Sequence, residues 1–192
     1  MKKYYIIIIA FLGCLGLQAK DMTGLKIYIN PGHGGYDSDD RNVAVYPYAQ
    51  GDTLGFWESS SNLHKGLMLR ELLQEQGATV AMSRVLNRTE DDRGLETIGR
   101  EASEWEADLF FSIHSNATGT SRRDNFPMML FRGYTENPVK PEDKVAAKIL
   151  FKHLIENQVT YWTQTEEYVV GDFDFYPDWN LSLIHISEPT RH

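Results

Sequence analysis

Strand-like and helix-like segments alternate along the chain from residue 25 to residue 113, and this order limits the fold more than any other feature. Residues 25–30, 79–83 and 109–113 are short apolar runs of the kind that form strands. Residues 63–76 and 95–107 lie between them and are expected to be helices, the first because its leucines recur at helical spacing. This alternation is typical of an α/β domain, so we predict a mainly parallel sheet flanked by helices.

The ends of these segments follow from turn and capping residues. Pro31-Gly32 stops the first strand. Residues 59–62 can cap the first helix, and Gly77 can stop it. The apolar run at 109–113 is continuous, which predicts a strand that is buried on both faces.

Further elements are expected after the third strand. Residues 127–131 are predicted to form a fourth strand and residues 142–158 a third helix. The apolar side of that helix is expected to contain Val145, Ile149, Leu150, Leu154 and Ile155. Residues 36–57 are expected to be a long polar and aromatic loop, while residues 159–180 show no pattern that assigns them.

Residues 1–19 have the pattern of an export signal. Lys2 and Lys3 precede an apolar run, and small and polar residues lead to Ala19. The run is shorter than the roughly 20 apolar residues that span a membrane. We therefore predict a cleaved signal peptide and an exported protein, periplasmic or extracellular. A leader that stays attached as an anchor is the alternative, and membrane attachment by a lipid would require processing at Cys14.

Residues 181–192 look like the translation of an adapter used in DNA library preparation. We expect them to replace the natural sequence from Leu181 onward, and we give His185 and His192 no function. Residues 20–180 then remain as one domain that is large enough for a real core. That domain is expected to be incomplete at its C-terminus.

Charge and cysteine content narrow the partners and the metal chemistry. The formal net charge is −8, and it becomes −10 when Lys2 and Lys3 are removed with the leader. Such acidity argues against nucleic acid and against an anionic membrane surface as partners. Cys14 is the only cysteine, so a mature chain without it would have to bind a metal through nitrogen and oxygen ligands.

Two histidines follow strands that are expected to end at the same edge of the sheet. His33 comes after the first strand and His114 after the third, and ligands bind at the carboxyl ends of parallel strands. Glu58 stands at the start of the first helix, where it either interacts with the helix dipole or serves as a third ligand. Each histidine can also be an ordinary polar residue. Two histidines and a carboxylate are nevertheless a ligand set of catalytic zinc sites.

Three segments resemble the zinc-dependent N-acetylmuramoyl-L-alanine amidases of the amidase 3 family. Residues 29–35 (Ile-Asn-Pro-Gly-His-Gly-Gly) are similar to the family's first ligand motif. Residues 58–62 (Glu-Ser-Ser-Ser-Asn) match its Glu-x-x-x-Asn segment, and residues 111–117 match the segment with the second histidine. Ser83-Arg84 is a weaker match. Together these segments occur in the family's order over residues 25–117.

The resemblance implies that His33, Glu58 and His114 bind one Zn²⁺, which would activate water near neutral pH and polarise an amide carbonyl. The bond cut would join the lactyl group of N-acetylmuramic acid to L-alanine in peptidoglycan. Asn116 and the loop of residues 36–57 would line the substrate groove. Two alternatives stay open: a zinc peptidase that cuts another amide, and a module that binds peptidoglycan without cutting it.

The chain departs from the family at two points. Asn30 stands where the family has aspartate. Asn30 can still hydrogen-bond the His33 ring, but it does not carry the negative charge of an aspartate. No segment matches the late strand that carries the family's catalytic glutamate, since Glu166 and Glu167 do not fit that strand. We therefore assign no catalytic residue.

We predict that residues 20–180 bind zinc but hydrolyse peptidoglycan poorly or not at all. The reason is that the glutamate that passes a proton to the leaving amine has no counterpart there. The rate of peptide release from purified peptidoglycan measures this, and near-normal amidase activity from residues 20–180 alone would contradict it.

Overall fold

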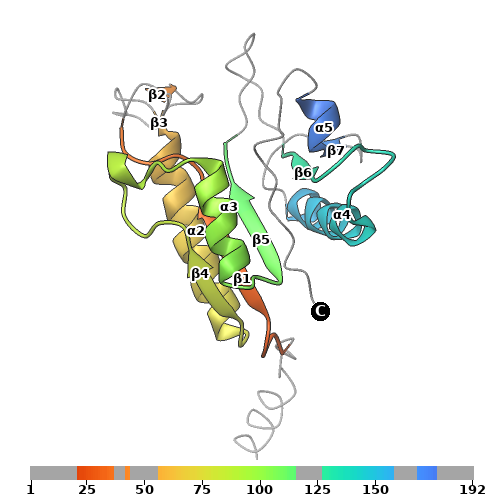
Figure 1. The fold of residues 1–192 in the computed structure, drawn as a ribbon, viewed down its shortest axis with the longest axis horizontal. Helices are drawn as coiled ribbons and strands as arrows, with labels where there is room; N and C mark the ends of the chain where they lie inside the picture. The colour runs from red at the N-terminus through yellow and green to blue at the C-terminus, as the bar shows by residue number, and fades with distance from the viewer. Residues whose placement is uncertain (1–20, 37–41, 44–55, 116–126, 158–167, 177–192) are drawn as a thin grey trace, which may run out of the picture.

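The first strand of the described residues, β1, lies in the middle of a three-stranded parallel sheet. The computed structural model describes residues 21–36, 42–43, 56–115, 127–157 and 168–176. The sheet has the order β4-β1-β5, and β1 pairs in parallel with both neighbours. The elements of this part are β1 (Lys26–Pro31), α2 (Glu58–Glu75), β4 (Thr79–Met82), α3 (Leu95–Glu104) and β5 (Leu109–Ile113). The predicted α/β class with a parallel sheet is confirmed (Figure 1).

Successive side chains of β1 face opposite sides of this sheet, and a helix covers each side. Ile29 packs in one cluster with Leu69 of α2. Tyr28 packs in another cluster with Ile98 of α3. This alternation follows from the two-residue period of a strand, and it explains why β1 is apolar without interruption.

The strand β5 is less buried than we predicted. Leu109 is 41% exposed, and within the described residues only β1 is hydrogen-bonded to β5. The strand therefore has an open edge in this part of the chain, whereas β1 has a neighbour on each side. The apolar run predicted the strand correctly but not its place in the sheet.

The helix α2 begins at Glu58, which is earlier than the expected cap within residues 59–62. Trp57 precedes the helix and makes no side-chain cap hydrogen bond. Within the expected cap, Ser59 and Asn62 instead donate to the carbonyls of Gly35 and Gly32 in the loop that follows β1. The predicted stop is confirmed, because the helix ends at Glu75 and Gly77 has a φ of +92°.

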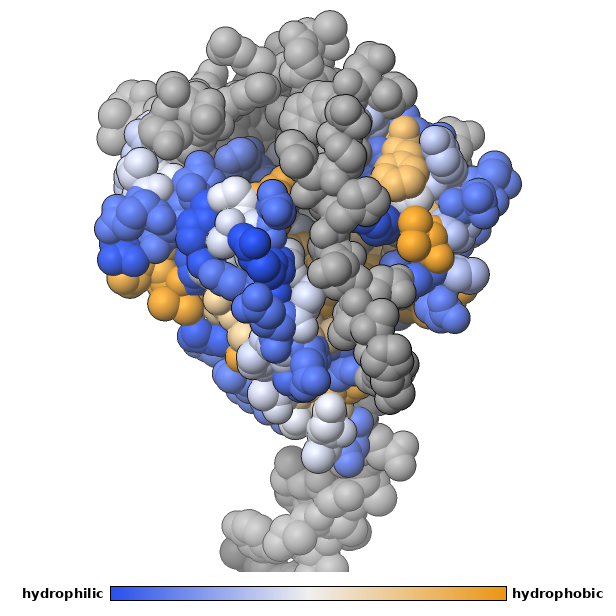
Figure 2. Space-filling view, viewed as in Figure 1, coloured by the Kyte–Doolittle hydropathy of each residue, from blue (hydrophilic) through white to orange (hydrophobic). Residues whose placement is uncertain are grey.

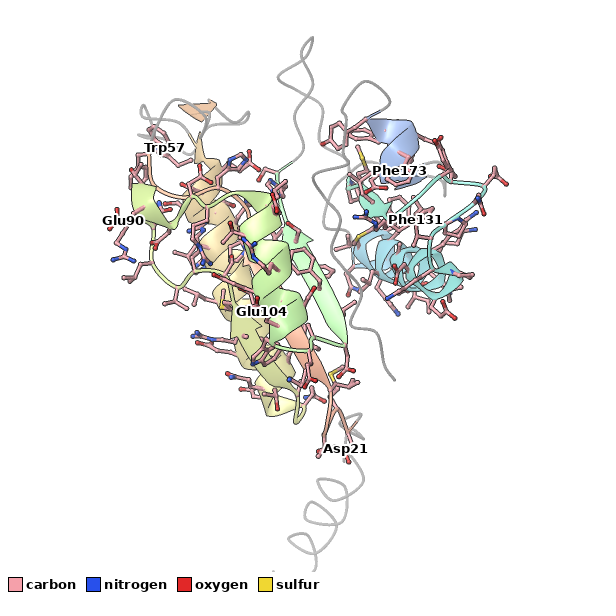
Figure 3. The ribbon with its side chains drawn as sticks, viewed as in Figure 1. Asp21, Trp57, Glu90, Glu104, Phe131 and Phe173 are labelled. Carbon is pink, nitrogen blue, oxygen red and sulfur yellow. The ribbon has the colours of Figure 1, made fainter. Side chains whose placement is uncertain are left out.

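Two short strands form a separate sheet. β6 (Met129–Phe131) pairs in parallel with β7 (Val169–Gly171), and α4 (Pro141–Glu156) packs against them. The core of this part contains Phe131, Ala147, Phe151 and Val169. Figure 3 shows Phe131 and Phe173 on this side of the molecule, with Phe173 in α5 (Asp172–Phe175). The fourth strand and the third helix are therefore present, but β7 rather than the first sheet is the partner of β6.

The apolar side that we predicted for α4 is wrong in part. Val145, Ile149 and Leu150 are 57%, 54% and 37% exposed. The buried residues are Ala147 and Phe151, four positions apart on the helix. A two-stranded sheet is narrow and covers only a thin stripe of a helix, and the large ring of Phe151 occupies that stripe.

The segment before α2 contains one small antiparallel pair, β2 (Asn42–Val43) with β3 (Phe56–Trp57). The rest of the expected 36–57 loop, apart from Tyr36, lies outside the described residues, as do the segments expected to be a signal peptide and an adapter. Among the described residues, no helix is long and apolar enough to cross a membrane.

We predict that Ile29→Ala lowers the free energy of unfolding by about 2–5 kcal/mol, because truncation of a fully buried side chain leaves a cavity. Leu72→Ala is the control, since Leu72 is 58% exposed and the change there should cost less than about 1 kcal/mol. Urea denaturation followed by circular dichroism measures both variants. Equal destabilisation by the two changes would contradict the prediction.

Candidate metal centre

Three potential metal ligands meet at the carboxyl edge of the three-stranded sheet. His33 follows β1, His114 follows β5 and Glu58 begins α2. Their ligand atoms all lie within 4.8 Å of one another. The structure thus brings together the three residues that the sequence analysis selected, from segments far apart along the chain.

The carboxylate of Glu58 lies close to both imidazoles. Its Oε1 atom is 3.5 Å from His33 Nε2 and 3.2 Å from His114 Nδ1. The two rings are 5.0 Å apart between centroids, with an angle of 83° between their planes. The side chains of Glu58, His33 and His114 are 14%, 28% and 46% exposed, so the centre is most open beside His114.

These distances suit zinc. Ligand atoms about 2.1 Å from an ion in tetrahedral geometry are about 3.4 Å apart, which is close to the two distances from Glu58. Two imidazole nitrogens and one carboxylate oxygen, with a fourth position for solvent or substrate, are also the donors of many catalytic zinc sites. The geometry and the chemistry of the three side chains therefore both fit Zn²⁺.

Hydrogen bonds keep Glu58 ionised. Burial alone would raise the pKa of this carboxyl group, but hydrogen bonds to the His114 ring, the Ser115 amide and Asn62, together with the charge of His33, lower the pKa to about 2. The Ser115 N–H and Asn62 Nδ2 donate to Oε1 at 2.8 and 3.2 Å. A carboxylate that is fixed in its charged form is suited to hold a cation.

The backbone of the His33 loop is tightly constrained. His33 has a φ of +60°, in the left-handed region that costs a residue with a side chain about 1–2 kcal/mol. Gly32 has no room for a larger residue, because a Cβ atom there would collide with the ring of His114. The Gly32 N–H also donates to the carbonyl of Ile113 at 2.9 Å. The loop that carries His33 is thereby tied to the strand that carries His114.

A buried arginine joins this loop to the start of α2. Arg84 is 4% exposed, and its Nε donates to the Pro31 carbonyl at 2.9 Å. Its Nη2 donates to the carbonyls of Gly32 and Ser59 at 3.0 and 2.7 Å. The remaining donors, on Nη1, bond to the Leu86 carbonyl and the Asn87 side chain. Every N–H of the guanidinium is thus used, and most of the acceptors are backbone atoms close to the candidate ligands His33 and Glu58.

Ser59 and Asn87 make a second connection between the same segments. Ser59 Oγ donates to the Gly35 carbonyl at 2.6 Å, and Asn87 Nδ2 donates to Ser59 Oγ at 3.2 Å. The Gly35 N–H in turn donates to Asn87 Oδ1 at 3.1 Å. The loop of residues 32–35, which contains His33, therefore bonds to α2 through Gly32 at one end and Gly35 at the other.

Asn30 does not take the role that we expected. Its side chain is buried, accepts a hydrogen bond from Ser83 Oγ at 2.7 Å and donates one to Ser112 Oγ at 3.0 Å. The hydrogen bond to the ring of His33 that this residue could have made is therefore not formed. Asn30 is still within β1, so its amide bonds to Ser112 on β5 and to Ser83 just after β4, whereas His33 follows the end of β1.

Two residues close to the centre were not predicted. Lys65 of α2 lies 3.5 Å from Ser115 Oγ. Tyr176 follows α5, and its pKa is raised by burial and by the negative charge of Glu58. Helical spacing from Glu58 points to Lys65, so the sequence contained a signal for it. No local pattern connects Tyr176 with residues so far away in the chain.

Two other histidines considered in the sequence analysis lie away from the centre. His64 is exposed on α2, and His153 is exposed on α4, where it lies 3.2 Å from Glu156. Both histidines are therefore on the surface, as expected. Asn116, which we predicted to bind substrate, lies outside the described residues.

We predict that Gly32→Ala abolishes high-affinity zinc binding while the protein stays folded, because the added Cβ atom displaces the His114 ring. Gly94→Ala is the matched control, since no heavy atom lies within 4 Å of the added Cβ atom there. Competition with a chromogenic chelator measures zinc affinity, and circular dichroism checks the fold. Retention of wild-type affinity by Gly32→Ala would show that His114 is not a ligand.

Comparison with known proteins links this centre to a family. The model of the amidase 3 family, described as N-acetylmuramoyl-L-alanine amidase, matches residues 27–172. A sporulation-specific N-acetylmuramoyl-L-alanine amidase of Bacillus subtilis is 36% identical over 96 residues, which cover 50% of this chain and 32% of that protein. A probable cell wall amidase of Staphylococcus aureus is 28% identical over 173 residues, covering 90% of this chain and 52% of that protein. The chain thus spans about a third to a half of the length of these relatives.

Solved structures share the fold. An N-acetylmuramoyl-L-alanine amidase of Nostoc punctiforme has a TM-score of 0.56 at 20% identity, with 77% of this chain and 73% of that chain covered. The CwlD amidase of Clostridioides difficile, solved in complex with the GerS lipoprotein, has a TM-score of 0.56 at 21% identity, with 86% and 79% covered. The family model matches most of the sequence and includes all three residues of the centre, and we conclude that this chain belongs to the amidase 3 family of N-acetylmuramoyl-L-alanine amidases.

Proposed function

We propose that this chain is an exported, zinc-dependent hydrolase that cuts the amide bond between N-acetylmuramic acid and L-alanine in peptidoglycan. One observation carries the proposal: His33, Glu58 and His114 place their ligand atoms within 4.8 Å of one another at the edge of the sheet. The spacing of these atoms suits Zn²⁺, and membership of the amidase 3 family supports this amide as the substrate bond.

The residues around the centre would hold the ligands ready. When bound, zinc supplies a Lewis acid that polarises the amide carbonyl. Glu58 contributes a negative charge, which the Ser115 amide and Asn62 stabilise. The two imidazoles contribute neutral nitrogen atoms. Because hydrogen bonds already fix the His33 loop and the start of α2, little further ordering is required of the chain.

The group that transfers a proton to the leaving amine is a separate question. On α5, Asp172 Oδ1 accepts a hydrogen bond from the Gly133 N–H at 2.7 Å, and Asp174 Oδ2 accepts one from the Thr135 N–H at 2.6 Å. These carboxylates stabilise a backbone turn. We infer that the proton-transferring group lies outside the described residues, in agreement with the lack of a matching glutamate in the sequence.

The substrate also constrains where the protein works. Peptidoglycan lies outside the cytoplasmic membrane, so its hydrolysis requires export. The signal-like pattern of residues 1–19 supports an exported domain formed by residues 20–180. Within that domain, Asn116 directly follows the His114-Ser115 segment, and we propose that it contacts the substrate.

We predict that the metal-free protein binds one zinc ion per chain. His33→Ala and His114→Ala should each weaken this binding by more than about 100-fold, because each removes a ligand. His64→Ala is the control, since His64 is exposed on α2 and should not affect affinity. Titration against a competing chelator gives the affinities, and no loss of affinity in either ligand variant would contradict the assignment.

Digestion of purified peptidoglycan tests the bond. We expect slow release, blocked by a chelator, of peptides that begin with L-alanine, leaving free lactyl carboxyl groups on the glycan. Mass spectrometry identifies these ends. Cuts inside the peptide would indicate a zinc peptidase instead. Retention on cell wall that a chelator does not affect, without any cleavage, would indicate a binding module.

A further inference from the structure

A lysine beside the metal centre has few partners of its own. Glu58, Asn62 and Lys65 lie on one face of α2, because they occupy positions i, i+4 and i+7. Asn62 is fully buried, whereas Lys65 is exposed. The ammonium group of Lys65 reaches Ser115, the residue next to His114. A positive charge thus lies at the same edge of the sheet as the candidate ligands.

A short polar path connects Lys65 with Glu58. Lys65 Nζ lies 3.5 Å from Ser115 Oγ, and Ser115 Oγ lies 3.5 Å from Asn62 Oδ1. The Ser115 N–H donates to Glu58 at 2.8 Å. Contacts of 3.5 Å are weak, since N–H···O hydrogen bonds in proteins centre near 2.9 Å. Ser115 therefore bonds firmly to Glu58 but only loosely to the lysine.

Other lysines of the described residues are better partnered. Lys26 lies 3.7 Å from Glu106 and over the ring of Trp105. Lys144 donates to a backbone carbonyl at 2.6 Å. Lys65, by contrast, has no carboxylate within ion-pair distance among the described residues. Lys65 is exposed at the helix surface, but neighbouring atoms still desolvate its ammonium group in part, which lowers its pKa, while the charge of Glu58 opposes this effect. A partly desolvated ammonium group with one weak hydroxyl partner is well suited to receive an anion.

The position of Lys65 along α2 allows it to meet an anion on the substrate. The coloured surface of the face drawn in Figure 2 is mostly hydrophilic, with a few hydrophobic patches. Lys65 is seven residues after Glu58, a rise of about 10 Å along a helix. Two extended peptide residues span about 7 Å. The peptide alone is shorter than this rise, but the long lysine side chain covers the remaining distance. A peptide that leaves the centre along this face of α2 can therefore bring a group on its second residue to Lys65.

We propose that Lys65 binds a carboxylate on the peptide side of the substrate, two residues from the bond that is cut. This inference rests on the proposed function, because it takes peptidoglycan as the substrate. The second residue of its peptide is a glutamate joined onward through its side chain, so its α-carboxyl group is either free or amidated. Lys65 would then make the protein prefer the free acid over the amide.

Binding of two ligands to the zinc-loaded full chain tests this. The ligands are N-acetylmuramoyl-L-alanyl-D-glutamate and its counterpart with an amide in place of the α-carboxyl group. We expect calorimetry to show that the acid binds about tenfold more tightly than the amide. Lys65→Met should abolish this difference by weakening binding of the acid alone, and Lys65→Arg should keep it. Mass spectrometry confirms that the ligands remain intact.

Lys152→Met is the control, because Lys152 is 72% exposed on α4 and pairs with Glu156. This variant should keep the wild-type preference. Equal binding of acid and amide by the wild type, or equal weakening of both by Lys65→Met, would overturn the inference while leaving the amidase assignment intact. If zinc binds but neither ligand does, the proposed substrate is wrong, and the role of Lys65 is wrong with it.

Discussion

The geometry of the candidate centre depends on one buried guanidinium group. Arg84 donates to the carbonyls of Pro31 and Gly32, which precede His33, and to that of Ser59, which follows Glu58. A buried charge costs several kcal/mol unless its hydrogen bonds are satisfied. Here backbone oxygens of two separate segments accept these hydrogen bonds. The guanidinium is therefore stabilised only when the loop after β1 and the start of α2 are correctly placed relative to each other.

The candidate ligands are ordered by hydrogen bonds within the protein. Glu58 is oriented by Asn62 and the Ser115 amide, and the Gly32 carbonyl accepts from Asn62 as well as from Arg84. Asn62 and Arg84 both bond to the peptide group that precedes His33. These bonds help to hold His33 in a left-handed backbone conformation, which a histidine adopts at some energetic cost. The strain is local, whereas the hydrogen bonds that oppose it come from two other elements of the fold.

The sequence predicted the centre better than the architecture around it. His33 and His114 could be placed together because parallel strands end at one edge of a sheet, and that rule needs no knowledge of distant contacts. The partner of β6 and the buried stripe of α4 depend on which segments meet in three dimensions, and local patterns do not contain this information. Asn30 shows the same limit, since its amide bonds to Ser112 on β5 and to Ser83, which follows β4.

The pairing of β1 with β5 has a consequence for how errors in folding would behave. Pro31 lies opposite Ile113, and both histidines follow within two residues of that pair. Because side chains alternate between faces, a slip of β5 by one residue would turn His114 toward the opposite helix layer. In a misaligned sheet the three candidate ligands would not meet, and the metal centre would not form. Selection for function therefore also selects the correct register of β1 and β5.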